Sequence, residues 1–262
     1  MKLTETITEN YEDISQTGID SLQVKKELSR IDSIIPLYEH WLEKTIFASV
    51  LIAINYTSAI KGLAKIKTQY TKEDITLFSL KLIDYESYPK FKESGIFLSA
   101  LVNTHYLQEK IKNKTQAKTH DEKEELQKPY EIVTQHLNTQ IDNLCYKTDG
   151  AVVCIKGSVG ETVAYYMKSG TVIVEGSYGK HSGYSMRGGT LILKKKAESE
   201  IGFLMRGGTI VIKDNSDLVS QNIIAGNILI YKEKKEYFCS IKKTAWGEKP
   251  IINCRTEHAK QN

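Results

Sequence analysis

Residues 186–193 are Met-Arg-Gly-Gly-Thr-Leu-Ile-Leu, and residues 205–212 are Met-Arg-Gly-Gly-Thr-Ile-Val-Ile. A third copy begins at Met167 with Met-Lys-Ser-Gly-Thr, so the methionine recurs at one constant interval. A degraded fourth copy at the same period, residues 224–228, carries Asn227 in place of the glycine. Asparagine also tolerates left-handed backbone. A repeat that keeps its period while its residues change predicts one structural unit per repeat.

Each copy leads into four apolar, mostly β-branched residues, which favour β-strands. Five such segments share the period: residues 152–155, 171–174, 190–193, 209–212 and 228–231. A period of about 19 residues is too short for strand–helix–strand and is typical of one coil of a parallel β-helix. The repeat itself is marked by Met167, Gly170, Met186, Gly189, Met205 and Gly208. We therefore expect about five coils, stacked about 4.8 Å apart.

Both faces of the predicted strands are apolar. Val172, Leu191, Ile210 and Leu229 begin the expected inward face. The intervening column contains Ile173, Ile192, Val211 and Ile230, preceded by Cys154. Strands that are apolar on both faces are usually covered on both sides. We expect the helical half of the chain, or a second subunit, to pack on this candidate interface.

Two further columns are candidates for function. Lys168, Arg187 and Arg206 share a register, and stacked positive charges repel one another, which favours an anionic partner. A solvated, screened edge is the simpler interpretation. Tyr165, Tyr184 and Phe203 form an aromatic column. A ladder of stacked rings that supports the coil is a better interpretation of it than a ligand platform.

The first 148 residues hold only three glycines, which favours helices there. We expect one helix from Asp20 or Ser21 toward Ile35, a new helix start at Pro36, and apolar residues at helical spacing from Leu37 to Ile66. The pair Thr71 and Asp74 resembles a capping box that opens a helix toward Tyr85. Further helices are expected at residues 90–112 and in a last segment ending near Tyr146. The predicted fold class is α+β: a helical bundle, 1–148, then the β-helix with a capping tail, 149–262.

The spacing Gly157-x-x-Gly160, Met167, Gly170, Gly176-x-x-Gly179, Gly183, Met186 and Gly189 is similar to the GXGXG β-helix domain. That domain forms the C-terminus of the large chain of glutamate synthase and one of the subunits of archaeal formylmethanofuran dehydrogenase. The resemblance covers about residues 151–231. It implies a spacer and assembly role, with the chemistry done elsewhere, so no catalytic residue is carried over. The sequence departs from the pattern where Lys195, Glu198, Asp214 and Asp217 replace glycines.

Composition sets further limits. The net charge of +4 over 262 residues is too small to indicate a nucleic-acid partner. The most apolar run, residues 46–54, is shorter than the roughly 20 residues that a membrane span needs. No secretory signal is evident, and the four cysteines form no CxxC pair. We therefore expect a cytoplasmic protein with reduced thiols.

Catalytic motifs are missing from the sequence. We find no nucleotide-binding loop, zinc helix or nucleophile elbow, and the six histidines are scattered. We therefore predict no catalytic residues, no metal and no cofactor. Glu198 and Asp217 are one period apart and would neighbour each other on adjacent coils. Such paired carboxylates are typical of sugar-cleaving β-helix enzymes.

Three functions follow, in order of preference. The first is a non-catalytic scaffold or assembly protein that binds a protein partner or a second copy of itself. The second is an accessory subunit of a glutamate synthase-like or formylmethanofuran dehydrogenase-like complex, as the resemblance implies. The third is a carbohydrate-active enzyme that uses Glu198 and Asp217.

Overall fold

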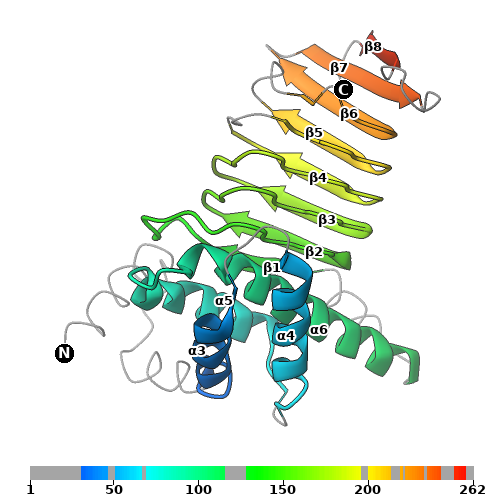
Figure 1. The fold of residues 1–262 in the computed structure, drawn as a ribbon. Coiled ribbons are helices and arrows are strands. Elements are labelled where there is room, and N and C mark those ends of the chain that lie inside the picture. The colour runs from blue at the N-terminus through cyan, green and yellow to red at the C-terminus, as the bar shows by residue number, and fades with distance from the viewer. Residues whose placement is uncertain are drawn as a thin grey trace, which may run out of the picture.

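The chain forms an α+β structure in which helices gather at one end of a stack of strands (Figure 1). This computed structural model describes residues 31–46, 51–66, 69–115, 128–195, 200–213, 219–220, 222–232, 235–242 and 251–257. The structural statements below concern these residues. The expected helix from Asp20 or Ser21 lies mostly outside them.

The helical part contains α3 (Ile35–Lys44), α4 (Ile52–Leu63), α5 (Lys72–Lys81) and α6 (Ser94–Thr115), with short 3₁₀ helices η3 (Leu82–Tyr85) and η4 (Phe91–Glu93). Pro36 lies in the first turn of α3, as predicted. The capping box is confirmed: Thr71 Oγ1 accepts from the Asp74 amide, and Asp74 Oδ2 accepts from the Thr71 amide at 2.8 Å. The helix after Pro89 begins at Ser94 rather than Lys90, because η4 intervenes.

The strands form one sheet in sequence order: β1 (Tyr130–Val133), β2 (Asp149–Lys156), β3 (Ser169–Val174), β4 (Thr190–Leu193), β5 (Thr209–Lys213), β6 (Gly226–Lys232), β7 (Lys235–Lys242) and β8 (Ile251–Glu257). β1 to β6 are parallel, whereas β7 and β8 are antiparallel. All five predicted strands are therefore confirmed. β7 pairs with the last parallel strand, at the edge where the sequence predicts a capping tail.

The expected helix ending near Tyr146 is wrong. Its described residues begin with β1, which pairs in parallel with β2, and continue through turns to Thr148. The reason is local: Pro129 disfavours helix before it, and Tyr130, Ile132 and Val133 suit a strand. The coil therefore begins before the proposed boundary at residues 148/149, and that division into domains stays a prediction.

The last parallel coil is one residue shorter than the repeat. Thr209 pairs with Asn227 and Ile212 with Ile230, whereas the full period would place Thr209 opposite Ile228. Gly226, at φ +124°, therefore holds the place of Gly208, and Asn227 replaces no glycine. The assignment of Ile230 to the outward column is corrected, because Ile228 and Ile230 are buried on the inward side. Leu229 pairs with Val211 and takes the outward position.

The inward face forms one continuous core along the coil. Ile132, Ile155, Val174, Leu193 and Ile212 succeed one another in register, and each is fully buried. The repeated methionines lie beside this core, each with no exposed surface. The Cε of Met167 lies within 2.6 Å of where a Cβ on Gly189 would stand. Met186 and Gly208 have the same relationship. The glycine of each motif thus leaves room for the methionine of the preceding coil.

The corner of each coil contains alternating left-handed residues. Thr162, His181 and Glu200 share one register at φ of 58–59°, and Tyr166 and Ser185 share another. The amides of Thr162 and Tyr166 donate forward to the next coil at 2.9 and 3.0 Å, whereas the Gly183 amide donates back to Val163 at 2.8 Å. Left-handed backbone in a non-glycine residue costs about 1 kcal/mol or more. These hydrogen bonds between coils offset that strain.

The helices complete the first edge of the sheet. Thr76 of α5 donates from Oγ1 to the Glu131 carbonyl at 2.7 Å, and Ser79 Oγ accepts from the Val133 amide at 3.0 Å. On α6, Ser99 Oγ accepts from the Tyr146 amide at 3.0 Å. Helix α5 packs against β1 and α6 against β2, below the stack in Figure 1. The expectation that the helical half covers the outward column is therefore wrong for the described helices.

Gly170→Ala should destabilise the protein strongly. Gly170 has φ +94°, and an added Cβ would stand 2.2 Å from the Ala151 carbonyl oxygen of the preceding coil. We expect the free energy of unfolding to fall by about 2–4 kcal/mol, measured by chemical denaturation. Gly62→Ala is the matched control. Gly62 lies in α4 with open space around it, so this change should stabilise by about 0.5–1 kcal/mol. Equal effects of the two changes would contradict this account.

Candidate functional site

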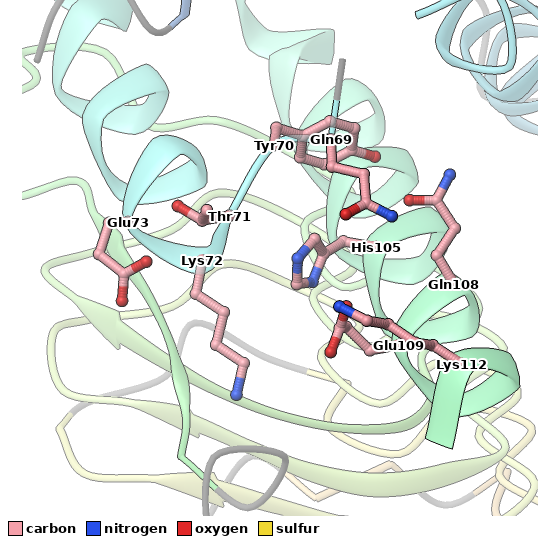
Figure 2. Close-up of a pocket in the computed structure, with 9 residues that line it drawn as sticks. All are labelled: Gln69, Tyr70, Thr71, Lys72, Glu73, His105, Gln108, Glu109 and Lys112. Carbon is pink, nitrogen blue, oxygen red and sulfur yellow. The ribbon is translucent and has the colours of Figure 1, made fainter. Parts of the chain in front are cut away.

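A small cavity lies where the first turn of α5 faces α6. Its volume is about 250 Å³, and Figure 2 shows its lining residues, which are Gln69, Tyr70, Thr71, Lys72, Glu73, His105, Gln108, Glu109 and Lys112. The capping box fixes the start of α5 and therefore the position of Lys72. The cavity is slightly smaller than typical ligand pockets of about 300–1,000 Å³.

His105 is the central side chain of the cavity. It projects from α6 into the space between Gln69, Lys72 and Glu109 (Figure 2) and is 8% exposed. Its Nδ1 is 2.8 Å from the Tyr130 hydroxyl. Burial lowers the pKa of His105 and raises the pKa of Tyr130, so both groups are neutral at pH 7. The pair joins α6 to β1 through a hydrogen bond between neutral groups.

Charged groups around His105 already have partners within the protein. Lys72 Nζ donates to the Lys128 carbonyl at 2.7 Å and lies 5.0 Å from the centroid of the Tyr130 ring. Glu109 Oε1 is 3.8 Å from Lys112 Nζ. Within the described residues, no three His, Cys, Asp or Glu side chains are grouped as a metal ion would need.

A second group of titratable side chains lies at the junction of η4 with the first coil. Glu93 is 7% exposed, and burial raises its pKa to about 7, with a further contribution from the charge of Asp142. Burial also raises the pKa of Asp142, which accepts from the Glu161 amide at 2.8 Å. Carboxyl pairs with raised pKa values occur in acid–base catalysis. Neither residue lines the cavity described above, which favours a structural role for this pair.

The aromatic column forms the stacked ladder that the sequence favours. The ring centroids of Tyr165 and Tyr184 are 4.6 Å apart at an interplanar angle of 5°, and those of Tyr184 and Phe203 are 5.5 Å apart. Tyr146 extends the ladder at 5.3 Å from Tyr165. Tyr146, Tyr165 and Tyr184 each contact a ring of the next coil. The ladder therefore stabilises the stack.

The basic column is exposed, and two of its members have neighbours of their own. Lys168 Nζ lies 3.6 Å from Asp149 Oδ2, and the Arg187 guanidinium lies 5.2 Å from the centroid of the Tyr166 ring. These contacts lessen the repulsion that would call for an anionic partner. Arg206 is exposed at the next position along the column. An anion-binding role for the column stays a prediction.

The outward column is continuous. Cys154, Ile173, Ile192, Val211 and Leu229 follow one another in register. Cys154 is 8% exposed, and the other four are half-buried. Along the same face, Glu175 Oε1 bridges Lys156 Nζ at 3.3 Å and Lys194 Nζ at 2.8 Å. The apolar strip is thus flanked by a row of ion pairs.

Sequence reasoning located the columns and missed the cavity. His105 and Tyr130 are distant in sequence, and no spacing or motif connects them. Tyr146 was missed as part of the ladder because the expected helix included it. The carboxylate candidates Glu198 and Asp217 lie outside the described residues.

Comparisons of the chain with family models, curated proteins and solved structures gave no match. No helix among the described residues is long and apolar enough to span a lipid bilayer.

The stability contributed by neutral His105 should depend on pH. Below a pH of about 6.5 the unfolded chain binds a proton at this residue that the folded chain resists, so stability is lost as the pH falls. The stability difference between wild type and His105→Gln should therefore shrink from about pH 7 to about pH 5. Urea denaturation over this range measures it, with exposed His40→Gln as the control. A difference that is constant with pH would contradict the buried neutral histidine.

Glu93→Gln should show the opposite pH dependence. The folded chain keeps a proton on Glu93 that the unfolded chain releases above its ordinary pKa of 4.5, so the wild type loses stability as the pH rises toward about 7. Glutamine cannot ionise, so the variant should be more stable by about 1–3 kcal/mol above pH 7 and nearly equal at about pH 4.5. Thermal denaturation across this range tests it. Exposed Glu131→Gln gives the effect of removing one surface carboxyl.

Proposed function

We propose that this protein is a non-catalytic assembly element whose coil offers a flat, rigid face to another protein chain. The observation that carries this proposal is the outward column on β2 to β6. Its half-buried apolar residues on β3 to β6 are not covered by the described helices, which lie at the β1 end of the stack (Figure 1).

The face has the composition of an interface. The apolar strip runs between a threonine row and a charged row. Thr171, Thr190 and Thr209 form the first, and Lys156, Glu175 and Lys194 form the second. An apolar centre with a polar rim is the usual anatomy of protein–protein interfaces. Parallel strands held in register are already ordered, so binding would require little loss of conformational freedom.

A second copy of the chain is the occupant that we propose. An isologous pair needs only this one face, because the same strip serves both subunits. Most soluble oligomers are symmetric assemblies of identical chains. The charged row also contains both signs of charge, so two copies can avoid placing only like charges together.

The resemblance of residues 151–231 to the GXGXG domain adds a finer proposal. In that family the coil is a spacer and assembly element, so the chain would serve as an accessory subunit of a glutamate synthase-like or formylmethanofuran dehydrogenase-like complex. The carbohydrate-active alternative depends on Glu198 and Asp217, and no observation on the described residues favours it.

Ile192→Lys should abolish the association. Ile192 lies at the centre of the strip and is half-buried, so lysine should reduce stability by less than about 1 kcal/mol while it places a charge in the interface. We expect wild type to sediment as a dimer and the variant as a monomer, with dimer affinity weakened more than about tenfold.

Gln140→Lys adds the same charge at an exposed turn outside the strand face and should leave the dimer intact. If the wild-type chain stays monomeric at high concentration, the proposal that a second copy binds this face is wrong. If Ile192→Lys dimerises as well as wild type, the proposal that this face forms the interface is wrong.

A further inference from the structure

Two of the four cysteines occupy the same register position on neighbouring strands. Cys239 of β7 is the pairing partner of Cys254 of β8 in the antiparallel ladder. The two residues are far enough apart in sequence that their spacing gave no sign of this. Only the antiparallel hairpin after β6 brings them opposite each other.

The backbone geometry of such a pair suits a disulfide bond. Directly opposite residues of antiparallel strands lie on the same face of the sheet, with Cα atoms about 4.5–5.5 Å apart. A disulfide needs a Cα separation of about 4.4–6.8 Å. A bond between these positions therefore requires no rearrangement of the strands.

The other two cysteines are poorly suited to compete. Burial raises the pKa of Cys145 to about 12, and it also raises the pKa of Cys154. The thiolate is the reactive form, so both buried thiols exchange slowly. Cys154 lies on β2, and four strands separate it from β7. At about 4.8 Å per strand, that distance is too great for a bond to Cys239.

We propose that Cys239 and Cys254 form a reversible disulfide that fastens the terminal hairpin. The oxidant is a low-molecular-weight disulfide such as glutathione disulfide. One cysteine thiolate attacks it and releases one small thiol, which leaves a mixed disulfide on the protein. The second thiolate then attacks the protein sulfur of that mixed disulfide and releases the second small thiol. Two protein thiols are oxidised by two electrons, and one small disulfide is reduced to two thiols.

The bond has a structural consequence at the end of the stack. β7 covers the free edge of β6, and β8 is held to the stack through β7 alone in the described ladder. Near the end of the same ladder, Glu236 is opposite Glu257, and like charges at opposite positions destabilise pairing. The disulfide holds β8 in place against this repulsion and slows local opening of the hairpin.

Tryptic mapping of the full-length protein tests the proposal. The chain is equilibrated with reduced and oxidised glutathione at several ratios, blocked with an alkylating agent and digested. Cleavage after Lys235, Lys242, Lys243 and Arg255 releases the two cysteines on separate peptides. Because Pro250 protects the bond after Lys249, Cys254 lies on the peptide of residues 244–255. Oxidising ratios should yield these peptides joined by a disulfide, at more than about tenfold the level of any other cross-link. Reducing ratios should yield both peptides alkylated.

Two variants and a second measurement complete the test. Cys154→Ser should leave the joined peptide unchanged, whereas Cys254→Ser should abolish it without loss of folded protein. Hydrogen exchange of the β7 and β8 amides should be slower in the oxidised wild type than in the reduced form, and equal in the two treatments of Cys254→Ser. Absence of the joined peptide at the most oxidising ratio would overturn the proposal. So would a bond to Cys145 or Cys154, or a bond between chains on a non-reducing gel.

Discussion

The backbone amides and carbonyls of a parallel coil form hydrogen bonds mainly with the neighbouring coils. The rest of the structure therefore depends on how the two ends of the stack are completed. Each end leaves a row of amides and carbonyls that must find partners. At the first end, side-chain hydroxyls of α5 and α6 do this, since Ser79 and Ser99 accept from amides of the first coil. At the other end, β7 reverses direction and pairs with β6. The described helices and β7 therefore have the same role, which is to supply hydrogen-bond partners to an end of the stack.

The interior of the stack is held by matched shapes at each repeat. A methionine fills the space that the glycine of the next coil leaves, and the left-handed corners direct amides alternately to the coils on either side. Such corners are strained in non-glycine residues, so they persist only where neighbouring coils supply hydrogen bonds. This explains why the period is kept so closely in the middle of the stack. It also explains why the coils differ in length at β1 and β6, where one neighbour is no longer a regular repeat.

Most of the coil could be predicted from the sequence, because a constant period determines which residues of neighbouring strands pair. Ile173, Ile192 and Val211 lie one above another as their spacing indicates. The prediction failed where the period itself changed. Residues 130–148 lack the methionine and glycine motif, so their first coil was taken for a helix. A one-residue deletion before Gly226 moved Ile230 from the outward to the inward column, since a shift of one residue moves a strand's side chains to the opposite face. The His105 cavity could not be predicted, because it depends on how α6 meets β1.

The columns along the coil differ in how much of their surface is free for function. In the aromatic ladder, the rings of Tyr165 and Tyr184 stack face to face, so the coil itself uses part of the surface that a ligand would need. In the basic column, Lys168 and Arg187 have neighbours within the chain. The outward strip lacks such an internal use. Its side chains contribute little to the core, yet the same register that builds the core keeps them apolar and aligned. A stack that needed only to fold could carry polar residues at Ile173, Ile192 and Val211, as it does at the threonine row beside them. The proposed interface therefore rests on this strip, whose side chains are aligned along the coil and half-buried.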